Sequence, residues 1–284
     1  MMTFNILAYL FWNPQREVFN FNLPFLNRPI LWYGVFFATG LALAYLIAYL
    51  LLKPHLKEKA SLVIDKISLY TCLGLIIGAK GADVIFYQGV DILKDDYFVF
   101  LRFWEPGLAS HGGLCGALSG IYLFYKFNPL IRKDISLLSL LDALVIPGLV
   151  LGCFIRCGNF FNQEVIGKPS TLPWAVIFGD PVDRNAIVPR HPTQIYEAIG
   201  CLLMALVFAY LWKKPFFKNY DGKIFSTFLV LFFSFRFFVE SFKLEQSSYL
   251  MNDQSHLMMG QYLSLPFILL GIYICIFKSN KKSL

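Results

Sequence analysis

Seven apolar stretches constrain the fold of this chain more than any other feature of its sequence. A helix needs about 20 mainly apolar residues to cross a bilayer. Windows of this kind cover residues 30–52, 66–88, 107–126, 135–156, 193–212, 223–242 and 257–277. Composition agrees, because 57% of the 284 residues are hydrophobic and 15% are charged, values that soluble domains rarely reach. We therefore predict an all-α membrane protein with seven transmembrane helices.

The basic residues between these windows predict the orientation. They gather after the first, third and fifth windows and in the tail: Lys53, Lys57, Lys59, Lys66, Lys126, Arg132, Lys133, Lys213, Lys214, Lys218, Lys223, Lys278, Lys281 and Lys282. Loops rich in Lys and Arg remain in the cytoplasm. We expect the N-terminus outside and the C-terminus in the cytoplasm. The net charge of +7 is scattered over short loops, so no nucleic-acid partner is expected.

Two segments outside the windows are expected at the outer surface. Residues 1–29 are aromatic and rich in proline and lack a basic n-region, which indicates an interfacial arm rather than a removable signal peptide. Residues 157–192 form the longest connection and contain five prolines, which predicts a small extracytoplasmic cap with a short hairpin. A long ordered loop above a membrane site is typical of a lid or substrate guide. With no internal repeats, residues 1–284 are interpreted as a single membrane domain.

Polar residues follow directly after the apolar run from Leu140 to Ile155 in the fourth window. Arg156, Asn159, Asn162 and Glu164 lie within nine residues. Placing a charged side chain at the edge of a bilayer costs several kcal/mol of free energy unless it is ion-paired, so such a side chain is first interpreted as part of a functional site. The predicted topology brings other polar groups to the same outer level, from Tyr33, His111-Gly112-Gly113, Arg236 with Glu240, and Gly260-Gln261. Convergence from five windows at one depth indicates a functional site.

At these positions the chain resembles the prolipoprotein diacylglyceryl transferases. The family signature, Gly-Arg-x-Gly-Asn-Phe-x-Asn-x-Glu-x-x-Gly, matches Ile155 to Gly167, with Ile155 in place of the first glycine. Four further family motifs match in order, at His111–Gly113, Pro189–Glu197, Phe235–Glu240 and Gly260–Pro266. Two basic positions of the family carry lysine here: the family usually has Arg where this chain has Lys80, and it often has a basic residue where this chain has Lys243. Lysine keeps the charge but lacks the planar fork with which arginine binds phosphate.

The resemblance implies an activity. Such an enzyme transfers the diacylglyceryl group of phosphatidylglycerol to the thiol of the lipobox cysteine of a prolipoprotein, releasing glycerol phosphate, as the first step of lipoprotein maturation. It would lie in the bacterial cytoplasmic (inner) membrane among membrane lipids, with its active site toward the extracytoplasmic face. No cofactor or metal is implied, since the His and Cys residues lack ligand spacing and no CxxC pair occurs.

The same resemblance assigns roles to individual residues. Arg156 and Arg236 are expected to clamp the phosphate, because guanidinium donors match phosphate oxygens. His111 is the candidate base for the thiol, since a free imidazole has a pKa of about 6.5. Contacts to phosphatidylglycerol are also expected from Asn159, Glu164, Tyr33 and Gly167. Structural or orienting roles are expected for Glu240, Asn162, Lys80, His191 and Glu197, with His191 and Glu197 holding the cap loop to the fifth span.

Each role has a simpler structural alternative. Arg156 could be a snorkelling arginine or pair with Glu164, and Arg236 could pair with Glu240 at i, i+4. The two asparagines could cap the helix end or shape the turn. Tyr33 could belong to the interfacial aromatic belt. His111 could position substrate without taking a proton.

Two other functional classes are open to a chain with this pattern of apolar windows. A transporter would place charges along a central pathway between two similar halves, whereas here the polar groups gather at one surface. An intramembrane hydrolase is suggested by Ser110 beside His111, but adjacent helix residues point about 100° apart and cannot form a serine–base pair. Product analysis separates the three classes, because only the transferase yields a thioether-linked lipid.

Overall fold

The computed structural model describes residues 9–22, 29–88, 98, 110–182, 186–244 and 257–278. The chain divides into two compact units. Unit 1 contains Met1–Leu46, Val145–Leu211 and Phe235–Leu244, and unit 2 contains Ile47–Leu144, Trp212–Ser234 and Glu245–Leu284. The single membrane domain interpreted from the sequence stays a prediction.

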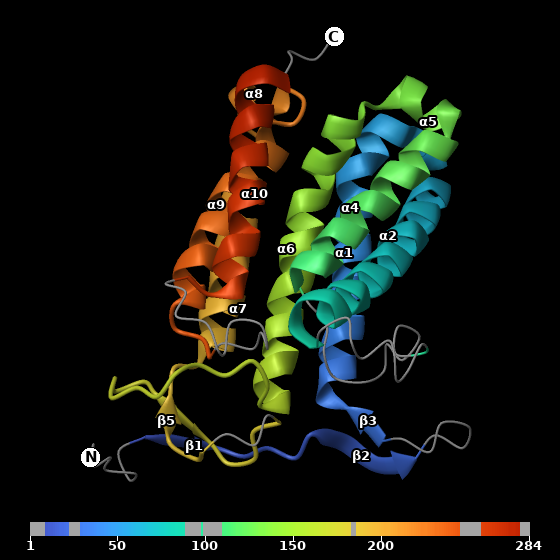
Figure 1. Cartoon of the computed structure of the whole chain (residues 1–284). Coiled ribbons are helices and arrows are strands. Elements are labelled where there is room, and N and C mark those ends of the chain that lie inside the picture. The colour runs from blue at the N-terminus through green and yellow to red at the C-terminus, as the bar shows by residue number, and fades with distance from the viewer. Residues whose placement is uncertain are drawn as a thin grey trace. The chain divides into compact units, whose positions relative to one another are not determined.

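A long helix overlaps each of the seven apolar windows (Figure 1). These helices are α1 (Trp32–Leu56), α2 (Ala60–Asp83), α4 (Ser110–Phe127), α6 (Leu137–Asn162), α7 (Thr193–Leu211), α9 (Lys223–Glu240) and α10 (Met259–Tyr273). Short helical segments adjoin them: η2 (Lys57–Lys59), η3 (Val84–Gln88), α5 (Pro129–Asp134), α8 (Pro215–Lys218) and η5 (Ile274–Lys278). The helical windows predicted from hydrophobicity are therefore present as helices.

Four helical stretches of the described chain are long and apolar enough to cross a membrane. They are Trp32–Phe86, which contains both α1 and α2, then Leu137–Asn162, Thr193–Leu211 and Met259–Lys278. Helix α9 does not qualify because three of its 18 residues are charged. These stretches identify a mostly helical membrane protein, and the count of seven spans stays a prediction.

In unit 2, helices α2 and α4 pack with their backbones in close contact. A Cβ atom built on Gly116 would lie 1.9 Å from the carbonyl oxygen of Gly74, and one built on Gly78 would lie 2.3 Å from the carbonyl oxygen of Gly112. Small residues spaced four apart permit such close approach between helices in a membrane. The contact sets the positions of His111 at the start of α4 and of Lys80 near the end of α2.

A buried carboxylate holds the start of α9 in unit 2. Asp142 on α6 is 1% exposed. Its Oδ2 accepts a hydrogen bond of 2.8 Å from the amide of Gly222, and its Oδ1 accepts one of 2.7 Å from the amide of Phe225. The first amides of a helix lack partners within the helix, so Asp142 satisfies two of these donors. Asp142 thus has a structural role in the described fold.

In unit 1, helix α6 extends beyond its predicted end. The sequence predicted an end near residue 156 and a cap starting at 157, whereas α6 continues to Asn162. The helix ends where Gln163 adopts a positive φ of 56°. Polar residues can continue a helix beyond its apolar segment where neighbouring side chains form hydrogen bonds or ion pairs with them. Arg156 and Asn159 therefore belong to the last turns of α6, which corrects the predicted boundary of the cap.

The cap contains a three-stranded sheet in unit 1. Strand β4 (Val176–Phe178) pairs antiparallel with β5 (Pro189–Arg190), so the predicted hairpin is present. On its other side β4 pairs parallel with β1 (Leu10–Trp12) of the N-terminal arm. The arm also forms a ribbon of β2 (Glu17–Asn22) and β3 (Pro29–Leu31), while residues 1–8 and 23–28 lie outside the described chain.

The cap and the end of α6 share a small core. Buried Phe160, Ile166, Val176 and Phe178 pack together, with Trp12 against them. The indole Nε1 of Trp12 donates a 3.1 Å hydrogen bond to the carbonyl of Phe160, and the two rings stack at 4.7 Å between centroids. These contacts attach the cap and the arm to the helix turn that carries Arg156 and Asn159.

Candidate functional site

The last turns of α6 present a chain of polar contacts. Nη1 of Arg156 donates to Oδ1 of Asn159 at 3.0 Å, and Nδ2 of Asn159 donates to Oε1 of Glu164 at 2.6 Å. The amide of Glu164 also donates to the carbonyl of Asn159 at 3.0 Å. Asn162, the last residue of α6, hydrogen-bonds the Glu164 side chain. The asparagines therefore both shape the helix end and link the arginine to the carboxylate.

Two residues of α7 hold the turn that follows α6. Oγ1 of Thr193 donates to the carbonyl of Val165 at 2.9 Å, and Nε2 of Gln194 donates to the carbonyl of Glu164 at 2.8 Å. Both side chains are fully buried, and Val165 has a positive φ of 56°. A β-branched residue with positive φ is uncommon and needs support from its surroundings. The sequence interpretation missed these two residues, although they lie within the matched Pro189–Glu197 motif.

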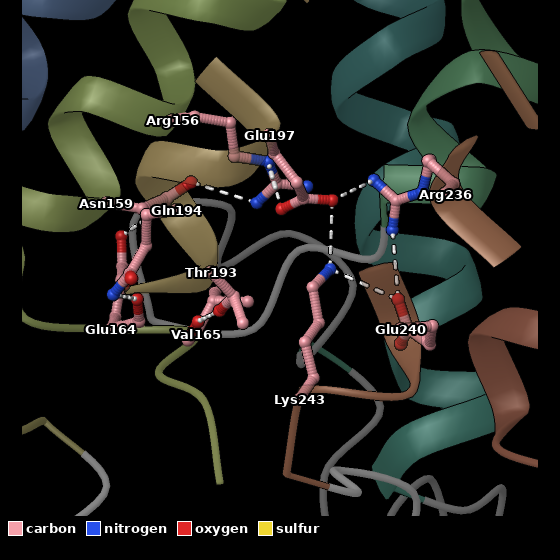
Figure 2. Close-up of polar contacts among 10 residues, drawn as sticks. All are labelled: Arg156, Asn159, Glu164, Val165, Thr193, Gln194, Glu197, Arg236, Glu240 and Lys243. Carbon is pink, nitrogen blue, oxygen red and sulfur yellow. Dashed lines mark hydrogen bonds and ion pairs between the residues drawn. The ribbon is translucent and has the colours of Figure 1, made fainter. Parts of the chain in front are cut away.

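Glu197 of α7 lies at the centre of the charged residues of unit 1. Figure 2 shows it between Arg156 on one side and Arg236 and Lys243 on the other. Its Oε2 lies 2.9 Å from Nε of Arg156, and its Oε1 lies 3.2 Å from Nη1 of Arg236 and 3.0 Å from Nζ of Lys243. The sequence interpretation had Glu197 hold the cap loop, whereas its described partners are three cations. A carboxylate that is 3% exposed requires such partners.

A second carboxylate joins the same cations from the end of α9. Oε2 of Glu240 lies 3.6 Å from Nη2 of Arg236 and 3.1 Å from Nζ of Lys243. The i, i+4 spacing of Arg236 and Glu240 had suggested this pair, and it is present. Lys243 is 4% exposed and contacts both carboxylates. We call Arg156, Glu197, Arg236, Glu240 and Lys243 the charge cluster.

The charge cluster contains three cations and two carboxylates. It therefore carries one more positive than negative charge when all five groups are ionised. Burial lowers the pKa of Lys243, and the nearby carboxylate of Glu197 opposes that shift. An excess of positive charge away from water attracts an anion strongly. A single phosphodiester carries the one negative charge that would neutralise the cluster.

Glu164 lies next to the charge cluster but contacts Arg156 through Asn159. Burial raises the pKa of Glu164, and hydrogen bonds from Asn159 and Asn162 and the charge of Arg156 oppose this shift. The carboxyl therefore takes up a proton more readily than an exposed glutamate does. The direct Arg156–Glu164 salt bridge considered from the sequence is replaced by a hydrogen-bonded link through an amide.

Two glycines of the signature permit close contacts in unit 1. A Cβ atom on Gly158 would lie 2.9 Å from Cδ2 of Tyr33, so the tyrosine ring packs directly against α6. A Cβ atom on Gly167 would lie 2.5 Å from the carbonyl oxygen of His191 and 2.9 Å from that of Phe242. Gly167 therefore packs closely between the cap and the segment after α9, and its expected contact with phosphatidylglycerol stays a prediction.

His191 of the cap contacts Tyr196 of α7. Its Nδ1 lies 3.2 Å from the hydroxyl of Tyr196, and its ring lies 5.0 Å from that of Phe242. Burial lowers the pKa of His191, and the charge of Lys168 lowers it further. The neutral imidazole is thus favoured at this position.

His111 and Lys80 belong to unit 2. Nε2 of His111 lies 3.4 Å from Oγ of Ser264, whose hydroxyl donates to the carbonyl of Gly260 at 2.7 Å. The imidazole lies near the rings of Phe233 and Phe267. Nζ of Lys80 lies 3.9 Å from Oδ2 of Asp83, and both side chains are buried. Ser264 and Gly260 come from the matched Gly260–Pro266 motif, so two motifs distant in sequence meet at His111.

The described residues contain no group of three His, Cys, Asp or Glu side chains arranged as metal ligands. The candidate site is therefore built from guanidinium, ammonium, carboxylate and amide groups. Such a set binds and orients anions and their hydrogen-bonding substituents.

Comparison with known proteins identifies the family. The family model for prolipoprotein diacylglyceryl transferase matches residues 20–277. A protein named phosphatidylglycerol–prolipoprotein diacylglyceryl transferase from Protochlamydia amoebophila is 31% identical, over 100% of this chain and 99% of its own length. Proteins of the same name from Chlamydia caviae and Tolumonas auensis are each 35% identical, over 97% and 96% of this chain and 96% and 99% of their own lengths. The chain therefore belongs to the prolipoprotein diacylglyceryl transferase family.

Proposed function

We propose that this chain transfers the diacylglyceryl group of phosphatidylglycerol to the lipobox cysteine of a prolipoprotein, the first step of bacterial lipoprotein maturation. A bond forms between the cysteine sulfur and the terminal glyceryl carbon. The bond between that carbon and the phosphate oxygen breaks, and glycerol phosphate leaves with the electron pair. The thiol proton passes to a base. Together with family membership, the charge cluster around Glu197 is the observation that carries this proposal.

Arg156 supplies the first phosphate contact. Its Nε is held by Glu197 and its Nη1 by Asn159, so two atoms of the guanidinium are fixed by the protein. Among the described residues, its Nη2 makes neither an ion pair nor a hydrogen bond. A guanidinium oriented along one edge presents its other donors in a defined direction, which favours binding of a phosphate oxygen.

Arg236 and Lys243 supply the remaining positive charge. Both are ion-paired with Glu197 and Glu240, so they are positioned before substrate arrives. Negative charge develops on the leaving phosphate oxygen as the bond to carbon breaks. Fixed cations in a site shielded from water stabilise such developing charge more than mobile ones do.

His111 is the proposed base for the lipobox thiol. The assignment rests on the match of His111-Gly112-Gly113 to the family motif, and the contact with Ser264 supports a fixed orientation of the ring. Gly112 permits close approach of α2 and α4 beside it. The substitution His111→Asn is expected to leave phosphatidylglycerol binding intact and to reduce transfer. Unchanged transfer would assign His111 a structural role.

The proposed placement is the cytoplasmic (inner) membrane, with seven spans and the site toward the extracytoplasmic face. The distribution of basic residues between the apolar windows supports this orientation. Single cysteines at Ile187 in the cap and at Lys59 after α1, in a background without the native cysteines, test it. A membrane-impermeant maleimide should label the first and not the second in spheroplasts. The reverse pattern would overturn the orientation.

The activity itself is tested with purified protein in detergent, phosphatidylglycerol and a lipobox peptide. Mass spectrometry should detect a diacylglyceryl adduct on the peptide cysteine. Arg156→Ala and Arg236→Ala should each lower turnover by about 10²–10³, whereas Lys59→Ala, which removes a lysine paired with Asp134 elsewhere in the chain, should not. A folded wild-type protein that forms no adduct, or near-normal turnover in either arginine variant, would contradict the proposal.

A further inference from the structure

Unit 1 contains an apolar groove of about 400 Å³. One wall is formed by Phe235, Phe238 and Val239 of α9 and by Phe242 just after it. The lining is completed by Tyr196 of α7 and by the cap residues Leu172, Trp174 and His191. We call it the α7–α9 groove. Its volume lies within the range of small-molecule sites, about 300–1,000 Å³.

The groove and the charge cluster use neighbouring residues of the same two helices. On α9, Phe235 precedes Arg236 and Val239 precedes Glu240, and on α7, Tyr196 precedes Glu197. Consecutive helix residues point about 100° apart. The apolar and charged groups therefore occupy adjacent faces of α7 and α9, so an apolar ligand in the groove can be joined by a short linker to an anion at the charge cluster.

The polar atoms beside the groove are already hydrogen-bonded to one another. Nε1 of Trp174 donates to the hydroxyl of Tyr196 at 2.8 Å, and that hydroxyl lies 3.2 Å from Nδ1 of His191. The remaining lining is apolar. A peptide in the groove would bring amide and carbonyl groups that need partners. An alkyl chain has no such groups, so the lining favours an alkyl chain.

We infer that the α7–α9 groove binds one acyl chain of the phosphatidylglycerol donor while its phosphate contacts the charge cluster. The inference rests on the proposed function, because it takes the donor headgroup to lie at Arg156, Arg236 and Lys243. Two exposed cap residues, Leu172 and Trp174, also line the groove, so the cap contacts lipid directly. A chain in the groove exchanges contacts with neighbouring lipid for close packing against these side chains, which makes the groove a determinant of acyl-chain length.

Filling the mouth of the groove tests this inference. Leu172→Trp enlarges an exposed lining residue of the cap, and Ile187→Trp makes the same kind of change at an exposed cap residue outside the groove. Turnover is measured with dipalmitoyl and with dihexanoyl phosphatidylglycerol. Leu172→Trp should raise KM for the dipalmitoyl lipid several-fold, because the added ring occupies space that the acyl chain would fill. Its kcat and KM for the dihexanoyl lipid should both equal those of wild type. Ile187→Trp should behave as wild type with both lipids.

A second variant guards against misfolding of the first. Phe238→Ala removes a ring that is 64% exposed and should raise KM for the dipalmitoyl lipid several-fold without affecting the dihexanoyl lipid. Equal effects on both lipids, no effect on either, or an increase in KM only for the lipobox peptide would overturn the inference, the last by indicating a peptide in the groove. Failure of the wild-type protein to form an adduct with either lipid would instead contradict the proposed function.

Discussion

Arg156 and Arg236, which lie 80 positions apart in the sequence, bind opposite oxygens of the same carboxylate, that of Glu197. Arg156 contacts Oε2 at 2.9 Å and Arg236 contacts Oε1 at 3.2 Å. The carboxylate therefore fixes the spacing of the two guanidinium groups. Their separation is a property of α6, α7 and α9 together, and it does not depend on a bound phosphate.

Glu197→Gln should inactivate the enzyme although it preserves the shape of the side chain. Three cations would lose a buried partner at once, and removing one member of a buried ion pair costs about 3–5 kcal/mol. We expect a large drop in thermal stability and a loss of transfer activity of at least about 100-fold. Thermal unfolding in detergent and the adduct assay measure the two effects. Wild-type stability and activity in this variant would show that the ion pairs are unimportant.

Lys243→Arg should be tolerated, and Lys243→Met should not. Arginine retains the charge that pairs with Glu197 and Glu240 and adds donors that suit phosphate, so we expect kcat/KM to stay within about threefold of wild type. Methionine removes the charge, and KM for phosphatidylglycerol should rise about tenfold. Lys168→Met, at an exposed lysine of the cap, is the control. A Lys243→Met enzyme with unchanged KM would exclude Lys243 from donor binding.

Glu164 should make stability depend on pH. Its pKa is raised in the folded protein by burial, so the folded state binds this proton more tightly than the unfolded state, in which a glutamate titrates near about 4.3. The stabilisation from this proton is complete below the pKa of the unfolded state. It is lost as pH rises through the pKa of Glu164 in the folded protein. The unfolding temperature of wild type should therefore fall, relative to Glu164→Gln, as pH increases from about 4.3. Parallel curves for the two proteins would show that Glu164 does not titrate differently on folding.

Gly116→Ala should disrupt the contact between α2 and α4. The added methyl group would lie 1.9 Å from a carbonyl oxygen of the facing backbone, so the helices must separate, at a cost of about 3 kcal/mol. Gly148→Ala on α6 is a matched control, because a Cβ atom there meets nothing within 4 Å, and it should leave stability unchanged or raise it slightly. Thermal unfolding in detergent compares the stability of the two variants with that of wild type. Equal stability of the two variants would mean that α2 and α4 adjust without cost.

The helices could be predicted from sequence because a long apolar run has few alternatives in a membrane. The exact end of α6 could not, because the polar residues after 156 are satisfied by partners that the sequence does not reveal. Similarly, the prolines of residues 157–192 indicated a hairpin, but the third strand comes from residues 10–12. Pairing between such distant segments leaves no local pattern.

Part of the candidate site was also predictable from the sequence. The pair of Arg236 and Glu240 follows from helix spacing, and the Arg156–Glu164 segment is recognisable as a motif. The central role of Glu197 depends on three cations from α6, α9 and the segment after α9. In the sequence, Glu197 is a carboxylate near the start of an apolar helix and the last residue of the Pro189–Glu197 motif. Both signals require a partner for the carboxylate, but neither says which cations supply it.

The pairing of β1 with β4 sets an order of events during synthesis. Strand β1 is among the first segments to leave the ribosome, and its partner Val176–Phe178 follows roughly 165 residues later. At a synthesis rate of about 5–20 residues per second, β4 follows β1 by some tens of seconds or less. The first four apolar windows are made in this interval, during which β1 has no β4 to pair with. The N-terminal strand thus cannot pair with β4 until four apolar windows have been made, and in the interval its unpaired edge is open to other extended chains.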